Sequence, residues 1–331
     1  MATISEVSKL AGVSVATVSR TLTMPEKVSA KTQIKVHDAV KKTNYKPNIL
    51  ARNFRTRKAS TIVVLVPDIA NIFFSRVIRG IEKTAMDMGY SVLIGDTQWL
   101  AEREYIYSNM VKTSQADGII QLHCRVPFED NKDLSFPIVN ACDCVKDFAM
   151  PTIQLDNRAA AKTMTEHLIS LGHKRIAVIL GPSESTLTED RFEGYKSAIE
   201  ESGLTFNSEM ISTGDFSIKS GQKAAQELLS KRIKPTAIFC FNDEMAFGAI
   251  HHIKKAGFSV PDDISVVGFD DISFAEYCDP PLTTISQPAE EFGAKAMLML
   301  YNILQNNELT VKDQLLPFEI IIRESSGPAK S

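Results

Sequence analysis

Several absences bound what this chain of 331 residues can be. Its five cysteines are an odd number and sparse for the length, which argues against a disulfide framework. Cys142 and Cys144 lack neighbouring Cys or His residues that would complete a tetrahedral zinc set, so we expect no metal. No apolar run is long enough to span a membrane, and no basic stretch followed by an apolar one marks a secretory signal. We therefore expect a reduced, cytoplasmic protein with no membrane partner.

Common catalytic motifs are also missing. The chain contains no phosphate-binding P-loop, no G-x-S-x-G nucleophile elbow and no paired metal-ligand motif. The adjacent His251 and His252 fall on an expected helix, away from the strand ends where active sites gather. An enzyme of nucleoside or sugar metabolism is the competing class, because α/β folds also host such chemistry. We expect a protein that is not an enzyme and needs no cofactor.

Charge is divided unevenly along the chain. The first 58 residues carry twelve Lys or Arg against three acids, a net charge of +9, whereas the whole chain sums to -3. The other 273 residues are therefore acidic, at -12. A basic segment beside an acidic body suits a module that binds a polyanion, since neutralising phosphates and releasing counterions favours only the basic surface. Nucleic acid is the expected partner.

The basic segment has the pattern of a helix-turn-helix. Thr3 to Glu6 fits a capping box, Gly12 permits a tight turn, and Ser14 can cap a second helix from Val15 to Leu22. Ser29 can cap a third helix that closes a small core. The alternative is an amphipathic hairpin with a solvated basic face.

The second helix of such a motif reads bases in the major groove. Arg20 can pair with guanine, while Val15 and Ala16 can contact a thymine methyl group. The head residues that we expect to contact DNA are Thr3, Ser14, Val15, Ala16, Thr17, Ser19 and Arg20.

The string from Thr3 to Arg20 closely resembles the DNA-binding head of the LacI/GalR family of bacterial transcription regulators. The resemblance implies a head at residues 1–46 and a hinge helix and linker at 47–60, where an apolar side chain is inserted into the minor groove. It implies further DNA contacts from Asn48, Leu50, Arg52 and Phe54. The family usually has Leu where this chain has Phe54, which could instead pack on the head.

From residue 61 to 331, apolar strands alternate with amphipathic helices, the rhythm of βαβ units and parallel sheets. The number of strands predicts two doubly wound α/β lobes, at approximately 61–157 plus 290–322 and at 158–289. The last strand, Glu319 to Ile322, is expected to return to the first lobe. Ligands of such sheets bind beyond the carboxyl ends of strands, where Asp68, Asp96, Asn242 and Asp270 lie. Each of these could instead cap a helix or be solvated.

Residues Gly181-Pro182, Asp190-Arg191, Asn242-Asp243 and Val267 to Asp270 resemble, in order, the family's effector domain. That resemblance implies lobes of the periplasmic-binding-protein type and a cleft that holds a small-molecule effector. The matching cleft residues are Phe73, Phe74, Arg191, Phe216, Asn242 and Asp270.

Segments such as Val66 to Ile69 and Tyr277 to Pro288 resemble nucleoside-responsive members of the family. The implied effector is a pyrimidine nucleoside, with Asp270 and Arg191 on the ribose hydroxyls and Phe73 or Phe216 against the base. A sugar and a purine stay open.

One head reads only half of a site, so we expect a homodimer on palindromic operator DNA. The chain ends without an apolar heptad repeat, so a tetramer formed by a coiled coil is not expected. We expect repression, although the sequence leaves open whether the effector releases or promotes DNA binding.

Overall fold

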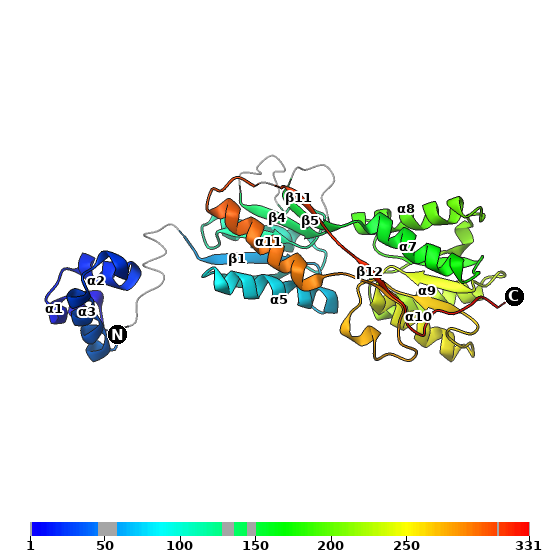
Figure 1. Cartoon of the computed structure of the whole chain (residues 1–331), viewed down its shortest axis with the longest axis horizontal. Coiled ribbons are helices and arrows are strands. Elements are labelled where there is room, and N and C mark those ends of the chain that lie inside the picture. Colours follow the sequence, from blue (N-terminus) through cyan, green and yellow to red (C-terminus); the bar gives the residue numbers. More distant parts are fainter. Residues whose placement is uncertain (1, 46–57, 128–135, 144–149, 310, 331) are drawn as a thin grey trace. The chain divides into compact units, whose positions relative to one another are not determined.

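The computed structural model describes residues 2–45, 58–127, 136–143, 150–309 and 311–330. Contacts within the chain divide it into two units, Met1–Ala59 and Ser60–Ser331. The first unit is a small helical head, and the second is a larger α/β body, drawn as ribbons in Figure 1. This is the predicted combination of an all-α head with an α/β body.

The head contains α1 (Ile4–Ala11), α2 (Val15–Thr23), the short 3₁₀ helix η1 (Pro25–Lys27) and α3 (Ala30–Thr43). Thr3 and Glu6 form the predicted capping box, and Gly12 ends α1 in the left-handed conformation at φ 64°. Ser14 caps α2 by accepting from the Thr17 amide at 3.1 Å. Ser29 occupies the N-cap of α3 without a side-chain capping bond, because its hydroxyl pairs with that of Thr32 instead.

The first lobe of the body is built on a parallel six-stranded sheet in the order β11-β5-β4-β3-β1-β2. Strand β3 is buried along its whole length and β1 at every residue after Thr61, because helices cover both faces. The strands are β1 (Thr61–Val66), β2 (Ser91–Asp96), β3 (Gly118–Gln121), β4 (Ile138–Cys142), β5 (Thr152–Leu155) and β11 (Asp313–Leu316).

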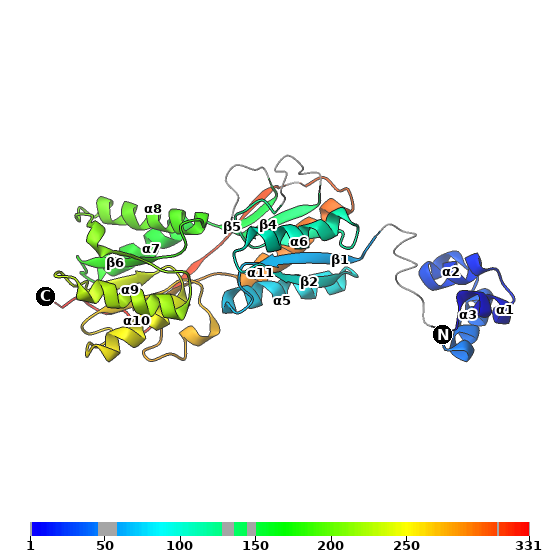
Figure 2. The ribbon, with the colours of Figure 1, turned by 180° about the vertical axis from the view of Figure 1, so that it is seen from behind.

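Three helices cover this sheet. Helices α5 (Ile72–Asp87) and α11 (Ala289–Leu304) lie on the face seen in Figure 1, and α6 (Ala101–Lys112) lies on the opposite face, seen in Figure 2. Helices α5 and α11 approach closely through Gly80 and Gly293. A Cβ atom on Gly293 would lie 2.0 Å from the Val77 carbonyl oxygen, so this packing requires glycine.

The second lobe has a parallel four-stranded sheet in the order β7-β6-β8-β9. Its helices pack in two pairs, α7 with α8 and α9 with α10. The strands are β6 (Ile176–Leu180), β7 (Ile211–Thr213), β8 (Ala237–Cys240) and β9 (Ser265–Val267). The helices are α7 (Asn157–Ser170), α8 (Thr186–Glu201), α9 (Ile218–Ser230) and α10 (Asp243–Lys255), with short 3₁₀ turns η2 (Ser208–Met210) and η3 (Ser273–Ala275).

The strand that returns to the first sheet is β11 and not the predicted segment Glu319 to Ile322. Strand β11 pairs with β5, whereas β12 (Glu319–Ile321) pairs antiparallel with β10 (Thr284–Ser286) in a separate two-stranded ribbon. After β12 the chain continues onto the second lobe, where the Ser325 carbonyl accepts from the Val266 amide at 2.8 Å. The body therefore has the two parallel-sheet lobes that the sequence predicted, with a different closing strand.

Candidate functional site

One pocket gathers side chains from strand ends and from the first turns of helices in both lobes. It is lined by all six residues predicted for the cleft, Phe73, Phe74, Arg191, Phe216, Asn242 and Asp270. Four further residues, Asn71, Cys142, Leu187 and Gln287, complete the lining. The empty volume is about 410 Å³, including open solvent at the mouth. The centre of a water-sized molecule can reach only about 40 Å³ of this space, so a larger ligand enters only when the lining side chains or the lobes move.

Aromatic rings form the apolar part of the pocket. The Asn71 side chain caps α5 by accepting from the Phe73 amide at 3.0 Å, which fixes Phe73 and Phe74 in the first helical turn. Their ring centroids lie 5.6 Å apart in an edge-to-face arrangement. Phe216 has the left-handed backbone φ of 69°, and its ring packs so closely that a Cβ on Gly181 would lie 2.2 Å from Cζ. Planar or apolar ligand surfaces suit these walls.

Arg191 is a buried cation on the first half of α8. Its Nε donates to Asn157 Oδ1 at 2.9 Å, its Nη1 donates to the Phe241 carbonyl, and the guanidinium stacks 3.5 Å from the Phe269 ring centroid. Burial lowers the pKa of Arg191 to about 10, against the opposing pull of Asp270, so it remains charged at neutral pH. None of these contacts uses Nη2, which leaves a fixed donor for a ligand.

Asp270 is a buried carboxyl group that lines the same pocket as Arg191. Its backbone has a φ of 117°, and its Oδ1 accepts from Gln287 Nε2 at 2.6 Å. Burial raises the pKa of Asp270 to about 7, although the Arg191 charge acts in the other direction. Oδ2 takes no part in the Gln287 bond. Arg191 and Asp270 together offer one donor and one acceptor, whereas the other polar lining residues, Asn71, Asn242 and Gln287, make hydrogen bonds within the protein.

Asn242 lines the pocket, yet both ends of its amide are engaged within the protein. Oδ1 caps α10 by accepting from the Met245 amide at 2.9 Å, and Nδ2 donates to the Phe216 carbonyl at 2.9 Å. The side chain therefore holds Phe216 in its left-handed conformation. We infer that Asn242 positions the aromatic wall.

Hydrogen bonds join the two lobes directly on either side of the pocket. Asp143, after β4, accepts from the hydroxyls of Ser185 and Thr186 at the start of α8. On the other side Arg76 Nη1 donates to the Asp271 carbonyl at 3.0 Å. The pocket therefore lies in a cleft that is closed by the protein's own contacts.

Sequence reasoning missed four lining residues. Asn71 is the helix cap before the predicted Phe73 and Phe74, and Cys142 ends a buried strand, so both had a local signal. Leu187 lies in the first turn of α8 and Gln287 follows β10, where only the fold reveals their direction.

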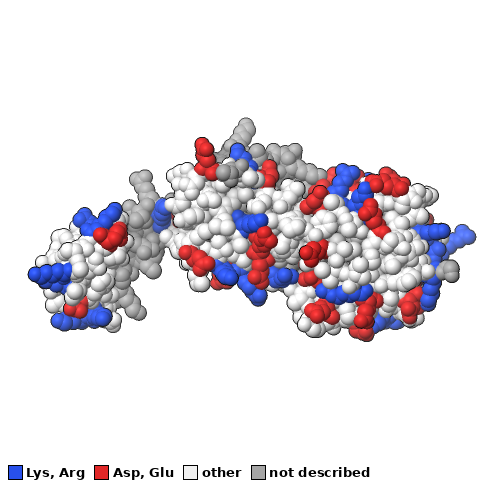
Figure 3. Space-filling model, in the orientation of Figure 1, with Lys and Arg blue, Asp and Glu red and all other residues white. Residues whose placement is uncertain are grey.

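The head presents its predicted reading helix on the surface. Val15, Ala16 and Arg20 are exposed, while Val18 and Thr21 of the same helix are buried in the head core. Thr3 and Ser14 are exposed caps, and Thr17 and Ser19 are half-buried. The face of the head seen in Figure 3 shows more Lys and Arg than Asp and Glu. The predicted contacts Asn48, Leu50, Arg52 and Phe54 lie outside the described residues.

Within the described ranges, no cluster of three or more His, Cys, Asp or Glu residues could hold a metal ion. No described helix is both long and apolar enough to cross a membrane.

In comparison with known proteins, two family models match separate parts of the chain. Residues 3–48 match the model of bacterial regulatory proteins of the lacI family, and residues 165–326 match a periplasmic binding protein-like domain. The chain is 41% identical to the transcriptional repressor CytR of Escherichia coli K12, covering 98% of this chain and 96% of CytR. It is 34% identical to the transcriptional repressor PurR of Vibrio vulnificus, covering 98% of each.

Among solved structures, a lac repressor dimer bound to operator and the anti-inducer ONPF is similar, with a TM-score of 0.88 and 28% identity. That match covers 98% of this chain and 99% of the repressor chain. The relatives are transcriptional regulators rather than enzymes, and they match the head and the body together. The chain therefore belongs to the lacI family of bacterial regulatory proteins, as a DNA-binding transcriptional repressor with an effector-binding domain.

Proposed function

We propose that this repressor binds palindromic operator DNA as a homodimer and that a pyrimidine nucleoside such as cytidine, bound between the lobes, changes its operator affinity. The observation that supports a nucleoside is that the Arg191 and Asp270 side chains and several aromatic rings line the same pocket. A cytoplasmic location and the absence of catalytic activity belong to the same proposal, supported by relatives that are DNA-binding repressors.

The pocket chemistry fits a nucleoside in two parts. Asp270 Oδ2 can accept hydrogen bonds from ribose hydroxyls, and Arg191 Nη2 can donate to the oxygens of the same hydroxyls. These hydrogen bonds to charged groups are stronger in a buried pocket than at a surface where water competes for the same groups. Phe73, Phe74 and Phe216 offer ring faces and edges to a planar base. A free sugar would use the first part of the pocket and leave the aromatic part without a planar partner.

The position of Leu187 favours a pyrimidine over a purine. Leu187 supplies no hydrogen-bonding atom to the pocket, and the neighbouring hydroxyls of Ser185 and Thr186 are occupied by Asp143. The start of α8 therefore offers few side-chain partners for the additional polar edge of a purine ring. The chain is also more similar to CytR, at 41% identity, than to PurR of Vibrio vulnificus, at 34%.

On DNA, we propose that Thr3, Ser14, Val15, Ala16, Thr17, Ser19 and Arg20 contact the operator from the head, and that Asn48, Leu50, Arg52 and Phe54 contact it from the hinge at 47–60. The exposed Arg20 supports base reading by its planar fork. The effector would act by linkage. If it binds one arrangement of the lobes more tightly than the other, it changes the fraction of the protein in the arrangement that binds the operator.

The proposal is tested by titrating the full-length protein onto fluorescent palindromic DNA across a salt series, with and without cytidine. Affinity should fall steeply with salt, because several phosphates are neutralised. Cytidine should shift operator affinity by about fivefold or more, the usual scale of allosteric coupling.

Calorimetric titrations with cytidine, adenosine and ribose distinguish the effector classes. Heat from cytidine alone supports the pyrimidine nucleoside. Heat only from ribose would assign the pocket to a sugar, and heat only from adenosine would assign it to a purine nucleoside. Absence of DNA binding at low salt would contradict the operator-binding model itself.

A further inference from the structure

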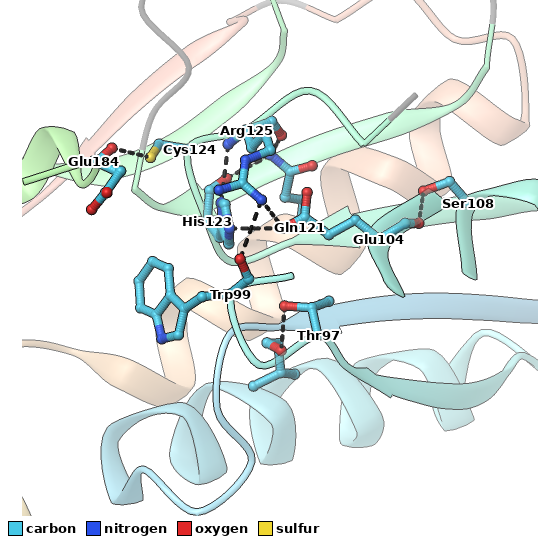
Figure 4. Close-up of polar contacts among 10 residues, drawn as sticks. Thr97, Trp99, Glu104, Ser108, Gln121, His123, Cys124, Arg125 and Glu184 are labelled. Carbon is cyan, nitrogen blue, oxygen red and sulfur yellow. Dashed lines mark hydrogen bonds and ion pairs between the residues drawn. The ribbon is translucent and has the colours of Figure 1, made fainter. Parts of the chain in front are cut away.

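A second cluster of buried polar groups lies in the first lobe, apart from the residues that line the pocket. Glu104 on α6 and His123 after β3 are 2% and 4% exposed, and His123 Nε2 lies 2.9 Å from Glu104 Oε1. Arg125 Nη1 contacts the same carboxylate oxygen at 3.3 Å. Figure 4 shows these side chains converging beside Trp99, the single tryptophan of the chain.

The cluster is incompletely satisfied. Glu104 Oε2 and Gln121 Oε1 are buried without a hydrogen-bond partner among the described residues, while the contact of His123 Nε2 is its 2.9 Å approach to Glu104 Oε1. Folded proteins rarely leave several neighbouring buried polar atoms in this condition. Side chains with unmet hydrogen bonds are held in place mainly by the residues packed around them. They can therefore change conformation when those neighbouring residues move.

The loop that carries Trp99 is strained as well. Gln98 and Trp99 have consecutive φ values of 51° and 60°, in the left-handed region that side chains other than glycine seldom occupy. Contacts from Arg125 and His123 add to the hydrogen bonds of Thr97 and Gln98 that hold the loop. Arg125 Nη1 donates to the Trp99 carbonyl at 3.3 Å, and the Trp99 ring lies against the His123 ring with centroids 5.1 Å apart.

The same segment is attached to the second lobe. Between His123 and Arg125, the Cys124 thiol donates to the Glu184 carbonyl at 3.0 Å (Figure 4). Glu184 lies just before Ser185, the N-cap of α8, and α8 supplies Leu187 and Arg191 to the pocket. Gln121 Nε2 ties the segment together by donating to the carbonyls of both His123 and Arg125.

We propose that Trp99, Glu104, Gln121, His123, Cys124 and Arg125 form a two-state clasp that transmits movement between the lobes to the surface of the first lobe. When α8 moves away, Cys124 loses Glu184, the Arg125 bond to the Trp99 carbonyl breaks, and the strained loop relaxes. The next residue, Leu100, is 52% exposed, so this relaxation reshapes the outer face of the lobe. Such a bistable element has the property that coupling between two sites requires. The clasp rests on the proposed function, because it regulates the response of the same pocket.

The first test uses Trp99 as a reporter in the full-length, ligand-free protein. Acrylamide quenching of its fluorescence is compared in wild type, Cys124→Ala and Cys124→Ser. We expect at least a twofold higher quenching constant in Cys124→Ala, and a value close to wild type in Cys124→Ser, which keeps a donor. Cys278→Ala is the matched control, because the Cys278 thiol donates to carbonyls within one lobe. Equal quenching in wild type and Cys124→Ala, or an equal rise in Cys278→Ala, would overturn the clasp.

The second test measures coupling. Cytidine affinity of the DNA-free protein should stay within about threefold in Cys124→Ala, whereas cytidine should change the operator affinity of this variant by less than about twofold. An undiminished effect of cytidine would overturn the clasp. If cytidine binds none of these proteins, the nucleoside assignment fails, and the quenching comparison in the ligand-free protein still decides the clasp.

Discussion

Effector affinity should depend on pH through Asp270. Burial raises the pKa of this carboxyl group to about 7, so about half of the empty pockets are protonated at neutral pH. Hydroxyl donors of a nucleoside favour the ionised carboxylate, and binding at lower pH must first remove the proton. At one pH unit below the pKa, removing the proton costs about 1.4 kcal/mol of binding free energy. Affinity at pH 6 should therefore be about tenfold weaker than at pH 8, with a plateau above pH 8.

Asp270→Asn is the matched variant. Asn has the same shape, tolerates a positive φ better than most residues, and can still pair with Gln287. A hydrogen bond to a charged group contributes about 1.5–3 kcal/mol, so affinity at pH 8 should fall about 10- to 150-fold. The affinity of the variant should also lose its dependence on pH between about 6 and 8.

Calorimetry with cytidine in buffers of different ionisation enthalpy measures both affinity and the protons released. Wild type should release about half a proton at pH 7 if its carboxyl group ionises on binding. Binding that strengthens toward pH 6 would mean that the neutral carboxyl group donates to the ligand, which would refute the reasoning. The same pH profile in Asp270→Asn would show that another group controls it.

Three further predictions concern the head and the helix packing. Arg20→Ala should weaken operator binding by about 1–3 kcal/mol and relax base preference, measured against single-base operator variants; a uniform loss across all of them would make Arg20 a phosphate contact. Thr3→Ala should destabilise the head by about 1 kcal/mol, seen as lower operator affinity at raised temperature, with Thr43→Ala as a control that spares the capping box. Gly293→Ala should destabilise the body by about 1–3 kcal/mol in urea unfolding, because its Cβ would meet the Val77 carbonyl; unchanged stability would mean that α5 and α11 separate without cost.

The sequence was most informative where local chemistry determines the outcome. The capping box at Thr3, the turn at Gly12 and the cap at Ser14 depend on residues within one helical turn, and all three formed as predicted. Ser29 shows the limit of this reasoning, because its hydroxyl found Thr32 as an alternative partner. Propensity identifies a helix start, while the competition between nearby partners decides the bond.

Contacts between residues far apart in the sequence were harder to predict from the sequence. Strand β11 is a four-residue edge strand in which only Leu316 is fully buried, so it lacks the alternation that reveals a half-buried strand. Strand β12 has a similar apolar content and pairs with β10 instead of the large sheet. The contact between Asp270 and Gln287 likewise joins residues whose side chains are brought together only by the crossing between lobes. Strand-end reasoning found Asp270, but no local pattern specified its partner.

The buried charges in and beside the pocket favour ligand binding over the stability of the fold. Asp143, Asp243 and Asp270 are all buried near Arg191, and burial raises the pKa of both Asp243 and Asp270. A core built for stability alone would avoid three buried acids beside one cation, because desolvated charges are costly unless fully paired. Asp143 and Asp243 are tied to hydroxyl groups of Ser185, Thr186 and Thr284, while Asp270 keeps an oxygen outside its bond to Gln287. Asp270→Asn should consequently raise the melting temperature at pH 8 by a few degrees even as it weakens effector binding, because it removes a buried charge whose main use is the ligand. A lower melting temperature in this variant would instead make Asp270 a structural counter-ion of Arg191.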